Sequence, residues 1–514
     1  MNDKSKNSNI FNGILAGTIN NILMIMLPFI SRTIILYKLG TNYIGLSGLF
    51  TSIIQMLSLT ELGFGSAISY ALYKPLANKD VKEVNRLLKL YKNIYFIIGI
   101  FISVLSILLI PFLKYLIKGD VPQDINIYIL YAFYIINTVS SYFFFAYKKI
   151  LLHANQRYDI DATVSTFTLI IQYIFQIMVL VSIGNYYLYV FILPVFTIIN
   201  NIICSKIIDR LYPQYKCRGN VRKNQLKSII KNAGGAFCSK IGSTIYLSAD
   251  NIVISAFLGL TILGKYQNYY YVISVLISLF AVIHNTIRPI IGNRLVTRQL
   301  EQNWNEFKKI YSIYIWLTIF ACSFCISLYQ IFEYLWAGND NLLPDYIPYL
   351  LVVFFFVTKL YGLLTVYQEA AGIWWHGKFI YIISAVVNLT INIILVNIIG
   401  LSGVIISSIV STLTVSIPGI VHIIFKYLFI EKSYKKEFVK MFISLNVKAV
   451  LTFIIVNQVT LLIKGYSFTV LLCRFIITLI IDILCYLILN IQSKEIKYIN
   501  KIIVSKITKR DINE

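Results

Sequence analysis

The sequence predicts an all-α integral membrane protein with about fourteen membrane-spanning helices. The chain is 58% hydrophobic and only 13% charged, a composition outside the range of soluble globular proteins. It divides into long apolar segments, each near the roughly 20 residues that a spanning helix needs. Basic connectors alternate along the chain with connectors that carry almost no lysine or arginine. Segments of about ten residues with alternating hydrophobicity, which a membrane β-barrel requires, do not occur.

The apolar segments are predicted to be the spanning helices in chain order. They cover residues 10–37, 42–73, 93–117, 125–152, 160–182, 186–208, 229–258, 264–292, 310–336, 344–371, 378–399, 402–426, 447–464 and 467–490. The stretch before the first segment is polar, and that segment is too long for the apolar region of a cleavable signal peptide, so none is expected.

The basic connectors predict the orientation of these helices. They comprise 74–92, 206–231, 294–309, 426–448 and the tail from Lys494. Because lysine and arginine accumulate in cytoplasmic loops, both termini and every second connector are predicted to be cytoplasmic. The net charge of +24 is then a topology signal. No soluble stretch is long enough to fold into a basic nucleic-acid-binding module, so nucleic acid is not an expected partner.

The short connectors and the absence of catalytic motifs argue against an enzyme. The connectors are about twenty residues or shorter, which leaves no room for an external catalytic domain. No phosphate-binding glycine loop or Walker lysine motif occurs. The CxxC of Cys322 and Cys325 lies within an apolar run, and no two histidines have the spacing of metal ligands. We therefore expect no cofactor and no metal site.

An internal repeat predicts two duplicated six-helix bundles. Residues 39–45 and 258–264 share the pattern L-G-x-x-x-[IL]-G, each at an outer turn between the first two helices of a half. The predicted organisation has an N-terminal bundle (1–208), a basic cytoplasmic connector (209–228), a C-terminal bundle (229–430), and a last part (431–514) with a basic loop, two extra helices and a cytoplasmic tail. Parallel halves of this kind pack about an axis normal to the membrane and form a site between them.

These segments resemble the polysaccharide flippases of the multidrug/oligosaccharidyl-lipid/polysaccharide exporter superfamily. Residues 61–65 (ELGFG) are similar to the family's acidic-Leu-Gly-x-Gly element, with Glu61 where aspartate is more common. Asp250, Gly259, Gly264 and Tyr266 match positions of its seventh helix. The resemblance covers the whole length in helix number and roughly residues 10–290 in motifs.

The resemblance implies a function for the chain. Such proteins move undecaprenyl-diphosphate-linked oligosaccharide repeat units from the inner to the outer leaflet of the bacterial plasma membrane, by alternating access, for the synthesis of O-antigen, capsule or teichoic-type polysaccharides. Its partners would be that lipid-linked oligosaccharide, membrane lipids, and a polysaccharide polymerase or glycosyltransferases. Two alternatives remain open: a flippase for the peptidoglycan precursor, and a cation-coupled exporter of drugs or small solutes.

Charged residues within the apolar segments are the candidate site. An ionisable side chain at the bilayer centre costs about 2.5–3.5 kcal/mol on insertion scales, so those that persist are functional candidates. We predict that Arg32, Lys240 and Lys359 line a cavity and bind the anionic diphosphate. Glu61 and Asp250 would balance these charges or bind a coupling ion, H⁺ or Na⁺.

Structural roles are the alternative for the same residues. Arg32 could extend to the outer head groups. Lys240 could form an ion pair with Glu61 or Asp250 between helices. The two charges of the last segment, Arg474 and Asp482, are expected to contact other helices rather than substrate.

Overall fold

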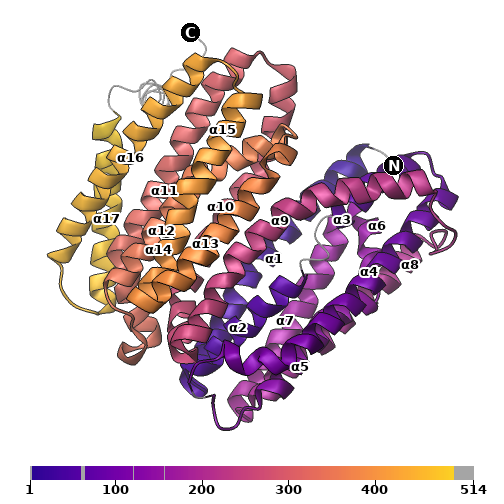
Figure 1. The fold of residues 1–514 in the computed structure, drawn as a ribbon, viewed down its shortest axis with the longest axis horizontal. Helices are drawn as coiled ribbons and strands as arrows, with labels where there is room; N and C mark the ends of the chain where they lie inside the picture. Colours follow the sequence, from indigo (N-terminus) through magenta and orange to yellow (C-terminus); the bar gives the residue numbers. More distant parts are fainter. Residues whose placement is uncertain (1–2, 59–63, 120, 156, 491–514) are drawn as a thin grey trace. The chain divides into compact units, whose positions relative to one another are not determined.

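The computed structural model describes residues 3–58, 64–119, 121–155 and 157–490. The side chains of residues 3–19 and of most residues between 224 and 247 lie outside that description. The described residues form helices and turns without any β-strand, which confirms the all-α class (Figure 1). The chain divides into two compact units: a first unit of Met1–Gln267 with Tyr381–Val404, and a second unit of Asn268–Ile380 with Ile405–Glu514.

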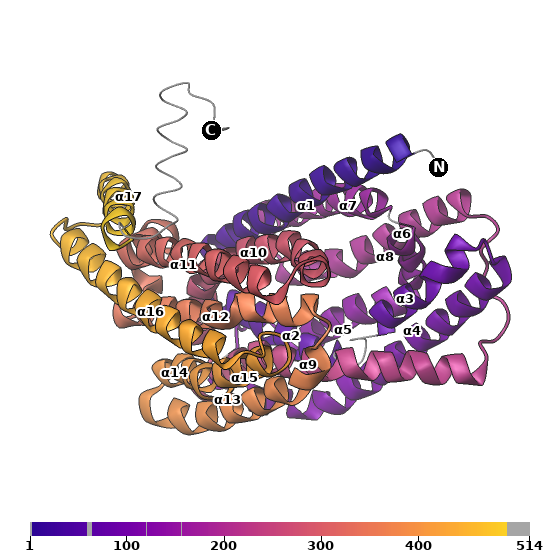
Figure 2. The ribbon, with the colours of Figure 1, turned by 90° about the horizontal axis from the view of Figure 1, so that it is seen from above.

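The first unit is built from the N-terminal helices and from parts of three helices that it shares with the second unit. Its helices are α1 (Asp3–Lys38), α2 (Thr41–Leu57), α3 (Phe64–Ala77), α4 (Val81–Leu109), η2 (Ile110–Leu116), α5 (Ile127–Phe143), η3 (Ala146–Lys149), α6 (Ile150–Ala154), α7 (Tyr158–Ser182), α8 (Tyr186–Leu211) and α9 (Lys223–Leu258). Within this unit α1 packs along α7, and α2 packs along α9 (Figure 2).

Three helices contribute to both units, and the remainder belong to the second. The shared helices are α10 (Leu260–Thr297), α13 (Lys378–Ile399) and α14 (Leu401–Ser411). The others are α11 (Leu300–Ala337), η4 (Asn339–Asn341), α12 (Tyr346–Ala370), η5 (Trp374–Gly377), the π-helical turn η6 (Thr412–Ser416), α15 (Ile417–Tyr427), α16 (Lys432–Leu461) and α17 (Phe468–Leu489). The two last helices pack on α11 (Figure 1).

Each predicted apolar segment falls on one helix or on consecutive helices. Among the described residues, 11 helices are long and apolar enough to cross a membrane, or up to 12 if the bent pair of Ile127–Phe143 and Ala146–Ala154 is one span. The segment 42–73 corresponds to α2 and α3, and residues 59–63 between them lie outside the described residues. The segment 402–426 is interrupted by η6 just before Pro418, whose ring and missing N–H disrupt regular helical bonding.

Local sequence sets several helix starts. Asp80 accepts a hydrogen bond from the Glu83 amide at 3.0 Å, and Asn185 accepts one from the Leu188 amide at 3.1 Å. Such side chains satisfy amide groups that have no partner within the helix. The turns before α4 and α8 are therefore encoded by single polar residues.

The two glycine-rich turns of the repeat pack against each other within the first unit. Gly40 and Gly259 hold equivalent positions with φ of 100° and 92°, a conformation that glycine adopts without steric cost. The Thr261 hydroxyl donates to the Asn42 side-chain oxygen at 2.7 Å, and the two residues are 219 positions apart, as are Gly40 and Gly259. The sequence repeat therefore forms a local two-fold contact.

An aromatic cluster joins α11, α15 and α16 in the second unit. Trp304 is 1% exposed and stacks on Tyr434 with ring centroids 4.9 Å apart. Its indole N–H donates to the Glu437 carboxylate at 2.9 Å, which Lys308 also contacts at 2.9 Å. Buried aromatic pairs contribute about 0.5–1.5 kcal/mol beyond their area, so this cluster anchors α16 at its N-terminal end.

Candidate functional site

Lys359 is a buried lysine of the second unit, near the middle of α12. Its side chain is 7% exposed, and its ammonium lies 5.1 Å from the ring centroids of both Phe280 and Phe355. Among the described residues of this unit, no carboxylate forms an ion pair with it. The faces of the two rings attract the cation, by about 2 kcal/mol when it is desolvated, which offsets only part of the cost of removing a charge from water.

Basic and hydroxyl groups gather near this lysine. His284 of α10 shares a hydrogen bond of 3.0 Å with the Tyr314 hydroxyl of α11, and an added Cβ on Gly362 would lie 3.4 Å from the His284 ring. Gly362, one turn beyond Lys359, leaves space for that hydroxyl, which an added Cβ would approach to 2.7 Å. Sequence reasoning missed His284 and Tyr314. The histidine inside an apolar segment was the available signal.

Arg32 begins a polar chain that crosses four helices of the first unit. The guanidinium donates to the Gln267 carbonyl oxygen of α10 at 2.9 Å. The Gln267 amide in turn donates to the Asn251 side-chain oxygen of α9 at 2.6 Å, and Asn251 donates to the Ser52 hydroxyl of α2 at 2.7 Å. Arg32 is half-buried. Its guanidinium is therefore bonded to the protein and does not only extend toward the outer lipid head groups. Asn251 and Gln267 were not among the predicted residues.

Asp250 lies beside that chain on α9 and contacts α13. It is 8% exposed, and its carboxylate accepts a hydrogen bond from the Asn392 amide at 2.8 Å. A hydrogen-bonded carboxylate costs less to bury than an isolated one. Gly242 lies about two turns before Asp250 on α9. An added Cβ on Gly242 would overlap the backbone of Tyr381. This close approach places α13 against α9 in the first unit.

Two predicted site residues lie outside the described part of the chain. Glu61 falls in the segment 59–63, and the side chain of Lys240 is among those of α9 that are not described. Of the other three, Arg32 and Asp250 belong to the first unit and Lys359 to the second. Their roles in binding and coupling stay predictions.

Asp482 of α17 is a fully buried carboxylate in the second unit. It is 0% exposed, and no described group lies at hydrogen-bond distance from either oxygen, although the Ser323 hydroxyl of α11 is close. A buried polar group without a hydrogen bond costs about 1–3 kcal/mol on mutational scales. We predict that Asp482→Asn raises the free energy of unfolding at neutral pH by about 1 kcal/mol, because the amide keeps the shape of the carboxyl group and cannot carry a buried charge.

Thermal unfolding of the purified protein measures this effect. Asp159→Asn is the matched control, because Asp159 accepts hydrogen bonds from the Arg157 guanidinium at 2.9 and 3.0 Å and its loss should lower stability. A decrease for Asp482→Asn as large as that for Asp159→Asn would contradict the prediction.

Comparison with known proteins gives similarity at the level of structure. No protein-family model matches the sequence, and no curated protein does. A solved structure of the lipid II flippase MurJ in an inward closed conformation has a TM-score of 0.67 at 14% identity, covering 93% of this chain and 99% of that chain.

Two multidrug resistance MATE family transporter structures of the MOP superfamily are also similar. The inward-facing one has a TM-score of 0.61 at 14% identity and covers 80% of this chain and 98% of that chain. The outward-facing one has a TM-score of 0.57 at 14% identity and covers 81% and 95%. The chain therefore has the all-α fold of these membrane transporters and of the lipid flippase.

Proposed function

We propose that this chain is a flippase that moves undecaprenyl-diphosphate-linked oligosaccharide from the inner to the outer leaflet by alternating access. The observation that carries the proposal is Lys359, a buried cation held between two aromatic rings with no ion-paired carboxylate in the described part of its unit. A desolvated ammonium without a counter-charge is suited to an anionic ligand, because a charge-assisted hydrogen bond then repays the desolvation.

Arg32 and Lys240 are proposed as further cations that bind the head group. Arginine offers a planar fork to two phosphate oxygens, and lysine offers a mobile point charge. Asp250 and Glu61 are proposed as the charge-balancing or coupling groups, with H⁺ or Na⁺ as the coupling ion. Binding of H⁺ or Na⁺ to one carboxylate would change the net charge around the bound diphosphate.

The lipid tail needs an apolar surface while the head group crosses. We propose that the two last helices provide it. A groove of about 350 Å³ on α16 is lined by apolar side chains and one amide, from Phe442 to Leu451.

Peptidoglycan-precursor transport is the second candidate function. The MurJ structure that covers nearly all of the chain is named as a lipid II flippase. A cation-coupled drug exporter is the third, and it is disfavoured because the proposed binding residues are net basic. A cationic drug would be repelled by Lys359.

Reconstitution in liposomes tests the function. Purified protein is supplied with fluorescent undecaprenyl-diphosphate oligosaccharide, with lipid II, or with a cationic dye, and translocation is followed for each. Movement of the oligosaccharide lipid supports the proposal. Movement of lipid II alone would establish the second candidate, and movement of the dye alone would establish the third.

Substitution of Lys359 tests the site. Lys359→Met is expected to reduce translocation about tenfold or more, since hydrogen bonds to charged groups contribute about 1.5–3 kcal/mol. It should leave thermal stability unchanged or raise it, because it removes a buried charge. Lys359→Arg should keep most of the activity, because the cation remains.

Lys378→Met is the matched control for this substitution. Lys378 also lies over aromatic rings, 3.7 Å from the Trp375 centroid, but at the end of its helix. Its translocation rate should equal that of the unaltered protein. If Lys359→Met translocates as fast as Lys378→Met, the assignment of Lys359 to the head group is wrong.

A further inference from the structure

The first unit contains a polar cavity apart from the residues discussed above. Its volume is about 630 Å³, within the range of small-molecule sites. Six of its lining residues have aromatic, basic or amide side chains suited to ligand binding: Tyr91, Tyr95, Lys149, His153, Asn200 and Asn201. All belong to the first unit, at the end of the helices that the basic connectors predict to be cytoplasmic.

A break in the fourth predicted span builds one wall of the cavity. The helix α5 and the segment Ala146–Ala154 meet at an angle of 52°, and Phe145 at the break has φ of 59°. A bulky residue in this left-handed region is uncommon, and such strain is found at functional sites. The Lys148 ammonium holds the segment after the break in place. It donates to the Asp209 carboxylate at 2.7 Å and to the Ser205 hydroxyl at 2.9 Å.

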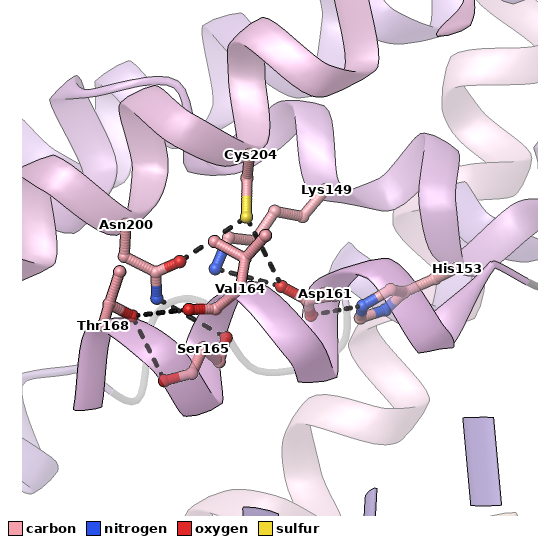
Figure 3. A network of polar contacts seen from close by, with 8 residues as sticks. All are labelled: Lys149, His153, Asp161, Val164, Ser165, Thr168, Asn200 and Cys204. Carbon is pink, nitrogen blue, oxygen red and sulfur yellow. Dashed lines mark hydrogen bonds and ion pairs between the residues drawn. The ribbon is translucent and has the colours of Figure 1, made fainter. Parts of the chain in front are cut away.

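The redirected segment presents two basic side chains on one face. Lys149 and His153 are four residues apart, about one helical turn. Both contact the same carboxylate of α7: Lys149 lies 3.2 Å from one Asp161 oxygen and His153 lies 3.0 Å from the other (Figure 3). The two side chains line the cavity and the carboxylate holds them in place, so this wall offers polar groups for hydrogen bonding.

Another part of the lining carries amides from α8. Asn201 is 5% exposed, lines the cavity, and its amide nitrogen has no hydrogen-bond partner among the described residues. A buried donor without an acceptor costs about 1–3 kcal/mol, which a ligand oxygen would recover. Asn200 beside it is held by weak contacts at 3.5 Å to Ser165 and to the Cys204 sulfur (Figure 3).

Two tyrosines from α4 complete the lining. The rings of Tyr91 and Tyr95 lie edge to face with centroids 4.6 Å apart, and their hydroxyl groups are 3.2 Å apart. Aromatic faces accept the apolar C–H surface of a sugar ring, while amides and basic side chains bind its hydroxyl groups. An acyl chain would leave the amides and the basic groups unsatisfied.

We propose that this cavity binds a sugar unit of the head group, with Asn201 as a hydrogen-bond donor to a ligand oxygen. The inference deepens the proposed function and rests on it for the identity of the sugar's carrier. The binding chemistry itself depends only on the cavity. A hydroxyl-rich ligand satisfies Asn201, accepts hydrogen bonds from the Lys149 ammonium, and packs on the tyrosine rings.

Protection of an introduced thiol tests occupancy without transport. Ser69 lines the cavity, so Ser69→Cys places a thiol there. The purified full chain is treated with a maleimide, and labelling is read at each cysteine by peptide mass spectrometry. Cys473 is exposed and serves as the reference in the same molecule. The probes are methyl glycosides of glucose, galactose, mannose, rhamnose and N-acetylglucosamine, together with N-acetylglucosamine 1-phosphate and inorganic phosphate.

At least one methyl glycoside is expected to slow labelling of the introduced thiol several-fold, while Cys473 is labelled at an unchanged rate. Protection by inorganic phosphate and by the sugar phosphate, but by no glycoside, would show an anion site and overturn the proposal. Protection by none of the probes would overturn it as well.

Two further variants connect the protection to Asn201. In the Ser69→Cys background, Asn201→Leu and Asn201→Asp both lack the donor and should abolish protection. Asn397→Leu changes an exposed amide that donates to the Ile393 carbonyl oxygen of its own helix, and it should preserve protection. Thermal unfolding shows whether each variant is folded; protection that persists in folded Asn201 variants would contradict the assignment.

The protection and liposome assays separate the two proposals. Translocation of the oligosaccharide lipid without glycoside protection would remove the sugar site and leave the flippase. Glycoside protection without translocation of either lipid would leave a saccharide site and remove the transport proposal.

Discussion

Replacing Gly264 with alanine is expected to lower the free energy of unfolding by about 3 kcal/mol. An added Cβ there would overlap the backbone oxygen of Thr41, and a Cβ on Gly45 would overlap the backbone oxygen of Leu260. These contacts are reciprocal, because the second glycine of each repeat turn lies against the backbone of the other turn. A backbone atom cannot move aside as a flexible side chain can, so the helices must separate.

Thermal or denaturant unfolding of the purified protein measures the effect. Gly292→Ala is the control, because its added Cβ would meet Ala370 only at an ordinary contact distance of 3.5 Å or more, and alanine gains up to about 1 kcal/mol in a helix. Gly45→Ala should resemble Gly264→Ala, and the double variant should cost less than the sum, because both disturb one contact. Equal stability of Gly264→Ala and Gly292→Ala would contradict the described packing.

Arg474→Met is expected to cost about 3 kcal/mol of stability. The Arg474 guanidinium donates twice to the Ile463 carbonyl oxygen, at 3.0 and 2.6 Å, and once to the Ser327 carbonyl oxygen of α11 at 3.1 Å. It therefore satisfies the Ile463 carbonyl group, which follows the end of α16, and links α17 to α11. Methionine fills similar space but leaves the Ile463 carbonyl group without this donor.

Arg474→Lys is the control for geometry. Lysine keeps the charge but lacks the planar fork, so it should recover only part of the loss. Proteolysis of the turn between α16 and α17 should accelerate in Arg474→Met, because the turn loses its link. If translocation falls while stability and proteolysis do not change, Arg474 has a substrate role instead of the structural one.

The contacts between distant residues were harder to predict from the sequence than the helices were. Arg32 and Asp250 stood out as charges in apolar segments, but their contacts with Gln267 and Asn392 join positions more than a hundred residues apart. Lys359 was found for the same reason, whereas the two phenylalanines that surround it resemble every other apolar residue in the sequence. Spanning helices are apolar toward both lipid and protein, so periodicity does not reveal the buried face.

The sequence by itself determined the all-α class, the positions of the spanning helices and the glycines of the repeat. Hydropathy accumulates over about 20 residues, and a bilayer leaves a helix as the means of satisfying that backbone. Only the tertiary structure decided the reciprocal glycine contact, the bend at Phe145 and the cavity lined by Lys149 and Asn201. Those features arise where distant helices meet, and their energies depend on distances that no local pattern encodes.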